Sequence, residues 1–265
     1  MISCRRSHAQ EKNPALVDMT TKKPRPASVQ ACLKDVGGPR ESVDGTLLLI
    51  GGTDLLHFQL RVAQNHLRHD MTPSSWSHIG IIMRCEGGLE LYEVALDPPG
   101  GFADMPASNG IHAVPLTRYD DAERYPNLAL LRFPVVERPG ETLCDAIDKV
   151  QRERGMLDLT AMVLPWLGFA WGAGLPTNPL LGGNGIPSAA FVEAVFAAVG
   201  MELTPGLATR ASCPEAIWQS ARWWHQYYER QTKPRTKTPK STSTPRGWYW
   251  IGQRHACLRE SPAAS

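Results

Sequence analysis

The sequence predicts an α+β fold in which a small antiparallel sheet packs on one long helix. Short runs of Leu, Ile and Val that are bounded by glycine or proline are typical of strands. A Gly-Gly pair at 87–88 lies between two such runs and predicts a hairpin. Residues 188–199 carry apolar side chains at helical spacing, which predicts an amphipathic helix. A hydrophobic content of 42% is enough for a packed core.

The chain of 265 residues suits one domain with polar ends, and two small domains are the alternative. Residues 1–40 are polar and predict a disordered region with a short helix near 29–34. The folded domain is expected over 41–230. A basic disordered linker rich in Lys, Thr, Pro and Ser follows at 231–246, and a C-terminal aromatic segment occupies 247–265.

The small net charge of +2 hides an uneven distribution. Residues 1–25 carry +4 and residues 231–246 carry +5, which leaves −7 on the rest of the chain. A nucleic-acid-binding domain would present a basic surface, so no specific nucleic-acid partner is expected. The basic ends instead predict weak, salt-dependent contact with anionic membrane surfaces.

The six cysteines are scattered without a Cys-x-x-Cys pair, which disfavours a zinc site and a disulfide framework. A reducing compartment is the default for such a chain, so a cytoplasmic location is expected. The N-terminus is basic but lacks the apolar core of a secretory signal. A mitochondrial presequence is the weaker alternative because Glu11 and Asp18 are acidic. No cofactor or metal is expected, since His66 and His69 alone have a loosely metal-like spacing.

Strands and helices are expected where the apolar pattern has the matching period. The expected strands are 43–50, 77–83, 89–96, 110–116 and 128–134. The run at 77–83 has few polar positions, so it is expected in the centre of the sheet, buried on both faces. The expected helices are 53–68, 141–153, 188–199 and 214–228.

Two segments leave alternatives open. Residues 157–175 are the most apolar stretch, and their length raises the question of a membrane span. Asp158, Pro165 and three glycines favour instead a helix followed by an apolar loop that walls a pocket. Residues 247–251, Gly-Trp-Tyr-Trp-Ile, predict a strand that docks back on the sheet, with an interfacial aromatic anchor as the alternative.

His78 and Ser188 are the candidate functional residues. His78 stands at the start of an apolar strand, and Ser188 stands at the start of the clearest helix. A helix N-terminus presents unpaired N–H groups that stabilise a developing oxyanion, and an imidazole opposite would take the proton. Glu93 lies on the next strand, where a hairpin would bring it beside the ring to fix its tautomer.

Each of these residues also has an ordinary structural explanation. A histidine in a strand is more often a half-buried packing residue than a catalytic base. A serine that precedes an apolar helix is more often its N-cap than a nucleophile. Glu93 has the alternative of facing solvent. Cys213, followed by proline and an apolar helix, is a weaker candidate nucleophile. The remaining histidines are assigned no role: His57, His66, His69, His112, His225 and His255.

Taken in order, these motifs resemble the circularly permuted papain-like cysteine hydrolases, the YiiX-like branch of the NlpC-type peptidase superfamily. This branch is related to the lecithin:retinol acyltransferase-like enzymes, and in it the histidine precedes the nucleophile. The similarity covers roughly residues 43–225. Its segments are 45–49 (Gly-Thr-Leu-Leu-Leu), 75–81 (Ser-Trp-Ser-His-Ile-Gly-Ile), 92–94 (Tyr-Glu-Val), 188–192 (Ser-Ala-Ala-Phe-Val), 204–205 (Thr-Pro) and 213–217 (Cys-Pro-Glu-Ala-Ile). The resemblance implies a permuted papain-like fold with Ser188, His78 and Glu93 at the catalytic positions.

The chain departs from the family at the nucleophile. Ser188, Ala189 and Ala190 stand where the family has Cys-Ser-Glu. A thiol ionises near neutral pH with modest help, whereas a serine hydroxyl needs a strong, well-placed base and a complete oxyanion hole. The combined loss indicates relaxed selection on the chemistry. An engineered Cys→Ser change is the alternative, and the altered neighbours argue against it.

Three functions are therefore considered. The first is a catalytically impaired papain-like protein whose cleft binds an amide- or acyl-bearing ligand, a peptide or a lipid. The second is an active amidase, esterase or acyltransferase in which Ser188 attacks, His78 acts as base and then acid, and Glu93 orients His78. The third is a membrane-peripheral interaction module that acts through the basic ends and the Trp-rich residues of 218–250.

Overall fold

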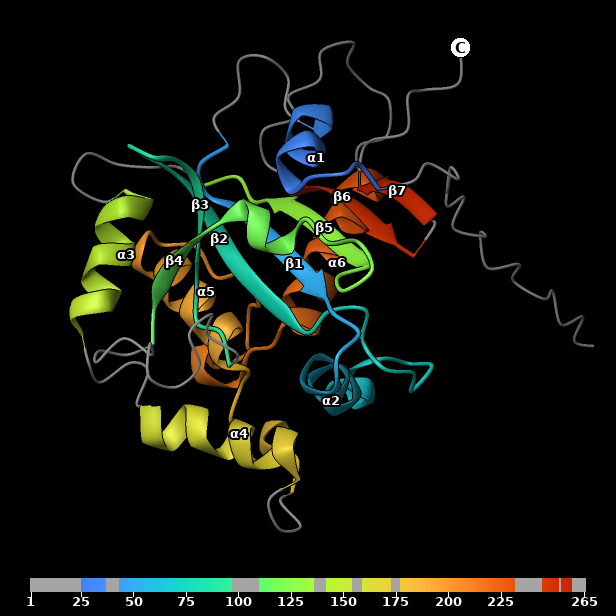
Figure 1. Ribbon diagram of the computed structural model, residues 1–265, viewed down its shortest axis with the longest axis vertical. Helices are drawn as coiled ribbons and strands as arrows, with labels where there is room; N and C mark the ends of the chain where they lie inside the picture. The colour runs from blue at the N-terminus through green and yellow to red at the C-terminus, as the bar shows by residue number, and fades with distance from the viewer. Residues whose placement is uncertain are drawn as a thin grey trace, which may run out of the picture.

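The computed structural model describes eight ranges of the chain: 25–36, 43–96, 110–135, 142–153, 159–172, 177–231, 245–252 and 254–258. Within these ranges the molecule is built around one antiparallel sheet with helices on both of its faces (Figure 1). The predicted α+β class is confirmed. The basic linker expected at 231–246 falls almost entirely outside the described residues.

The sheet has seven strands in the order β4-β3-β2-β1-β5-β6-β7, and every neighbouring pair is antiparallel. The strands are β1 (Thr46–Gly51), β2 (His78–Cys85), β3 (Gly88–Glu93), β4 (His112–Pro115), β5 (Asn127–Arg132), β6 (Arg246–Ile251) and β7 (Arg254–Leu258). The sheet has one strand more than the sequence predicted, because β7 pairs with β6 at its edge. Trp250 is fully buried, so the prediction that this aromatic segment docks as a strand is confirmed.

Side chains on the central strand β1 alternate between two cores, as the period of two in a strand requires. Leu47 and Leu49 join a core formed with α3 (Leu143–Arg152), α5 (Pro187–Ala198) and α6 (Pro214–Gln231). Leu48 and Ile50 join a second core on the opposite face, formed with α1 (Val29–Val36). The two faces are called the α5 face and the α1 face below.

Helix α1 belongs to the folded body. Its apolar residues Val29, Cys32 and Leu33 are buried in the α1-face core. The Val29 N–H donates to Asp120 Oδ1 at 2.8 Å, and the Arg25 guanidinium donates to the main-chain carbonyls of Tyr119 and Tyr125. The expected short helix is therefore confirmed, and it is packed rather than part of a disordered region; residues 1–24 and 37–42 lie outside the described ranges.

Helix α4 (Leu164–Trp171) follows a π-helical turn at Leu159–Val163 and occupies much of the apolar 157–175 stretch. It packs against α2 (Leu55–Ala63), and both helices lie beyond one end of the sheet (Figure 1). The indole N–H of Trp166 donates to the Gly185 carbonyl at 2.8 Å, which ties α4 to the residues before α5. In the described part of the chain, the helices are too short or too polar to span a bilayer.

Candidate functional site

His78 and Glu93 form a buried imidazole–carboxylate pair. Ile81 pairs with Tyr92 across the β2–β3 hairpin, so Glu93 lies opposite Gly80 and diagonal to His78. His78 Nε2 lies 2.8 Å from Glu93 Oε2, and Glu93 is 0% exposed. The expectation that the hairpin brings Glu93 beside the ring is confirmed, and the alternative that Glu93 faces solvent is wrong. Glycine is required at position 80, because a Cβ there would lie 2.7 Å from Leu91 Cγ.

Two further side chains complete the cluster around Glu93. The Tyr119 hydroxyl donates to Glu93 Oε2 at 2.7 Å, and the Tyr119 ring stacks on His78 with centroids 6.0 Å apart. His112 lies directly opposite Glu93 in the β3–β4 pair, and its Nε2 is 3.4 Å from Glu93 Oε1. The second ring nitrogen of His112, Nδ1, lies 3.0 Å from the Gly110 carbonyl oxygen. We call His78, Glu93, His112 and Tyr119 the Glu93 cluster.

The sequence assigned His112 no role, and Tyr119 was not considered. The strand at 110–116 was expected from its apolar pattern, so a register in which it pairs with the strand of Glu93 would have identified His112. Tyr119 lies in the 3₁₀ turn Leu116–Tyr119, whose position on the α1 face depends on tertiary packing. Sequence reasoning had no signal for it.

Glu93 is held in its ionised form by the cluster. Burial alone would raise its pKa, but attraction to His78, the close contact with His112, and hydrogen bonds from His78 and Tyr119 outweigh burial and hold the pKa well below its usual range. A carboxyl group with a lowered pKa in the folded state stabilises the fold above the pKa of the unfolded chain. This contribution is lost as pH falls from the unfolded-state pKa through the folded-state pKa.

The pKa of His112 is displaced in the opposite sense. Burial would lower it, but the interactions with Glu93 and the Gly110 carbonyl outweigh burial and raise it, despite the opposing positive charge of Arg118. A histidine whose pKa is raised by folding stabilises the protein fully below its unfolded-state pKa. That stabilisation is lost as pH rises through the folded-state pKa, so Glu93 and His112 favour the folded state together between the two transitions.

Ser188 lies in the first turn of α5, and its side-chain hydroxyl makes no hydrogen bond. The helix begins at Pro187 with Ile186 as its N-cap, and no side chain caps it. Ser188 is 1% exposed, and its Oγ has no hydrogen-bond partner. The alternative that Ser188 is an ordinary N-cap is therefore wrong, and a buried hydroxyl without a partner is an unusual and costly feature.

Ser188 is not joined to the Glu93 cluster. Ile79, Ile81 and Met83 of β2 pack in the α5-face core, so alternation directs His78 towards the other face, where it meets Tyr119. The residues next to Ser188, Ala189 and Ala190, pack in the α5-face core. The structure thus brings together two of the three predicted residues, and it records no hydrogen bond between Ser188 and either of them.

Cys213, the weaker candidate nucleophile, is buried, and burial raises the pKa of its thiol to about 12. A thiol with this pKa is protonated near neutral pH and is a poor nucleophile. Within the described residues, Cys32, Cys85, Cys144 and Cys213 form no disulfide bond.

A second polar network links the start of β2 to α2. His57 Nδ1 lies 2.7 Å from Ser77 Oγ, and His57 Nε2 lies 3.9 Å from Asp54 Oδ2. The residue types match a Ser-His-Asp triad, but Ser77 is fully buried and its Oγ also contacts the Ile50 carbonyl and the Gly52 N–H. No substrate reaches such a hydroxyl, so this network fixes the end of β1 against β2 and α2.

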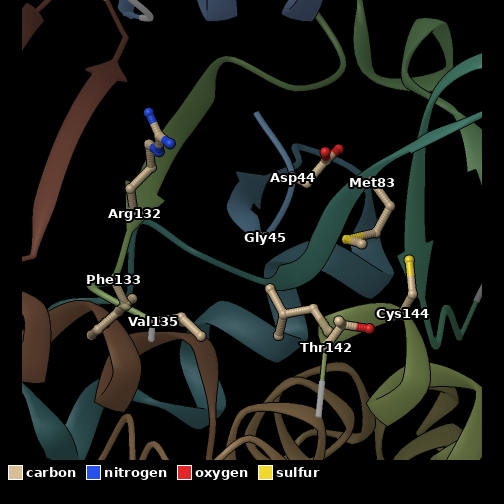
Figure 2. Close-up of a pocket in the computed structure, with 9 residues that line it drawn as sticks. Asp44, Gly45, Met83, Arg132, Phe133, Val135, Thr142 and Cys144 are labelled. Atoms are coloured by element: carbon tan, nitrogen blue, oxygen red, sulfur yellow. The ribbon is translucent and has the colours of Figure 1, made fainter. Parts of the chain in front are cut away.

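A surface pocket of about 470 Å³ is lined by residues outside the Glu93 cluster, and Figure 2 shows these lining residues. It is lined by the segment before β1, the end of β2, the end of β5 and the start of α3, with Asp44 and Arg132 as its charged side chains. Met83 near the end of β2 belongs to it, whereas His78 starts that strand. Its mixed apolar and charged lining shows no arrangement of catalytic groups.

In the described ranges, no group of three or more His, Cys, Asp or Glu side chains is arranged to hold an ion. No protein-family model matches the chain, and no curated protein matches its sequence. The arguments for function therefore rest on the residues and their geometry.

Replacing Glu93 by Gln tests the electrostatic role of the cluster. We expect Glu93→Gln to lower the free energy of unfolding at pH 7 by about 3 kcal/mol, because it removes the charged partner of buried imidazoles. The deficit relative to the wild type should shrink as pH falls below the unfolded-state pKa of Glu. Urea unfolding between pH 3 and pH 8 measures it, with the exposed Glu123→Gln as the control. An equal deficit at every pH would show that the charge of Glu93 contributes nothing.

Proposed function

We propose that this chain is a catalytically impaired protein of the permuted papain-like type that binds an amide- or acyl-bearing ligand at the Glu93 cluster. The order of the motifs supports the family assignment. The buried pair of His78 and Glu93 supports a retained, oriented imidazole.

The observation that carries the proposal is the state of Ser188. A serine nucleophile needs a base within hydrogen-bond reach. Ser188 Oγ has no hydrogen-bond partner, and His78 uses its Nε2 on Glu93 and lies on the α1 face. A hydroxyl without a base retains a pKa far above neutrality and does not attack an amide or ester at a useful rate.

The ligand class follows from the chemical group that His78 still offers, which is its Nδ1 atom. Among the described residues, His78 Nδ1 has no hydrogen-bond partner, so it offers a lone pair when the ring is neutral. Such a nitrogen accepts an N–H or O–H from a ligand. An amide N–H of a peptide or of an acylated amine meets this requirement.

Activity-based labelling separates an impaired protein from an active serine hydrolase. We expect the wild type to react with a fluorophosphonate probe no more than Ser188→Ala does, and to hydrolyse neither acyl esters nor amides above the rate of that variant. Labelling that disappears in both Ser188→Ala and His78→Ala would contradict the proposal, because it would require the two side chains to act as a pair.

Ligand binding is measured in the same proteins by side-chain NMR of His78 during titration with N-acyl amides and short peptides. We expect saturable shifts at His78 that are unchanged in Ser188→Ala. Shifts confined to residues outside the Glu93 cluster would place the ligand elsewhere.

A second candidate function is contact with a lipid surface, and an exposed apolar surface favours it. Five large apolar side chains of α2, α4 and the neighbouring turn Pro179–Gly182 face solvent: Leu55 (67% exposed), Phe58 (46%), Leu164 (54%), Trp171 (61%) and Leu181 (69%). No Asp, Glu, Lys, Arg or His occurs between Asp158 and Glu193. Exposed apolar side chains on elements that contact one another are typical of surfaces that bind a membrane or a partner. The Trp-rich segment considered from the sequence is a poorer anchor, since Trp218 and Trp250 are buried.

Liposome co-sedimentation tests the lipid contact. We expect Trp171→Ser combined with Leu181→Ser to reduce the bound fraction several-fold, because each loses apolar area that would enter the interface. Trp223→Ser is the matched control, as this tryptophan is 60% exposed on α6. Binding that is abolished by 0.5 M salt and is indifferent to the double substitution would assign the contact to the basic ends instead.

A further inference from the structure

The Glu93 carboxylate lies between two imidazoles and uses a different oxygen for each. Oε2 contacts His78 Nε2 at 2.8 Å and the Tyr119 hydroxyl at 2.7 Å. Oε1 faces His112 Nε2 at 3.4 Å, and its alignment with that nitrogen falls short of a hydrogen bond. Both Oε1 and His112 Nε2 are buried without another partner.

The proton positions on His112 follow from the two atoms that it faces. Its Nδ1 faces the Gly110 carbonyl oxygen at 3.0 Å, and a carbonyl oxygen only accepts, so Nδ1 carries a hydrogen. Its Nε2 faces a carboxylate oxygen, which also only accepts. A lone pair on Nε2 would repel that oxygen, so Nε2 carries a hydrogen as well. An imidazole with hydrogens on both nitrogens is the cation.

The same reasoning gives His78 a different set of ring hydrogens from that of His112. Its Nε2 faces Glu93 Oε2 and carries a hydrogen. Its Nδ1 has no hydrogen-bond partner among the described residues, so nothing there requires a second hydrogen. One cation is enough to balance one buried carboxylate, and a second would be a desolvated charge without compensation.

We propose that His112 is the counter-ion of Glu93 and acts as a positioning residue: as an imidazolium it balances the carboxylate, so that His78 stays neutral with the Nδ1 lone pair available. The inference rests on the proposed function, since it explains how that site presents an acceptor to an amide N–H. The groups that face this pair are His78 on β2, Glu93 on β3, and Arg118 and Tyr119 in the 3₁₀ turn. Arg118 opposes the charge of His112, whereas Glu93 favours it.

The two histidines that face the Glu93 carboxylate therefore have different roles: His112 carries the positive charge, and His78 offers the hydrogen-bond acceptor. Without the charge of His112, the buried Glu93 would need another cation, and His78 is the nearest group that can provide one. His78 would then hold hydrogens on both nitrogens and lose the acceptor. His112 would thus control ligand binding through the protonation of His78, without contact with the ligand.

Two-bond ¹H–¹⁵N correlation spectra of ligand-free protein labelled with ¹⁵N-histidine test the inference, because they distinguish the cation from each neutral tautomer. At pH 7 we expect the wild type to show His112 as the cation and His78 as the neutral Nε2–H tautomer. In His112→Gln we expect the fraction of cationic His78 to rise from a minor to a major population. His66→Gln, at an exposed histidine, is the matched control and should leave His78 unchanged.

A wild-type spectrum with neutral His112, or with cationic His78, at pH 7 would overturn the inference, and this readout remains decisive if His112→Gln fails to fold. An unchanged neutral His78 in a folded His112→Gln would overturn it too. The proposed function fails by a separate observation, the absence of ligand-induced shifts at His78, while the ligand-free protonation states remain as described.

Discussion

A fully buried carboxylate is the constraint on which the functional part of this structure depends. Glu93 sits near the end of a strand with no exposed surface, and an ionised group in that position persists only if its oxygens are paired. The fold provides partners from three elements: His78 on β2, His112 on β4 and Tyr119 in the turn that follows β4. Removing any one leaves a buried polar group without its partner. The three-stranded part of the sheet, its register and the turn are therefore coupled through one side chain.

The sheet that assembles the Glu93 cluster places it on the α1 face, whereas helix α5, which carries Ser188, packs on the other face. Successive residues of β2 point to opposite faces, so the strand that contributes Ile79 and Ile81 to the α5-face core directs His78 to the α1 face. Helix α5 contributes its residues to the first of these cores. A shift of register by one residue would exchange the faces and would also expose the apolar side chains of β2. The face on which the His78 imidazole lies is thus fixed by the pattern that buries the sheet.

Much of this arrangement was predictable because the local patterns are strong. The strand that begins at His78, the hairpin at 87–88 and the helix after Gly185 follow from period and turn residues, and the hairpin brought Glu93 to His78 as expected. The strand at 247–251 also followed from its aromatic and β-branched residues. These features depend on contacts that are close in the chain or on one element at a time.

The features that were not predicted depend on contacts between distant segments. The pairing of Glu93 with His112 requires the β3–β4 register, which crosses the long connection at 94–111. The packing of α1 depends on a core that Tyr119, Tyr125 and Trp250 complete. The short polar sequence around α1 does not indicate that these distant residues contact it. To predict the face of the sheet on which His78 lies, one must know which elements pack on each face. The order of His78, Glu93 and Ser188 along the chain therefore did not reveal that only the first two form a hydrogen bond.

Double-mutant cycles on unfolding free energy test the central claim most directly, since they measure whether two side chains interact. For His78→Gln and Glu93→Gln, the account predicts a coupling energy of about 1–3 kcal/mol at pH 7, as expected for a buried hydrogen-bonded pair. For His78→Gln and Ser188→Ala it predicts a coupling within about 0.5 kcal/mol of zero. A coupling of about 1 kcal/mol or more between His78 and Ser188, or none between His78 and Glu93, would contradict it.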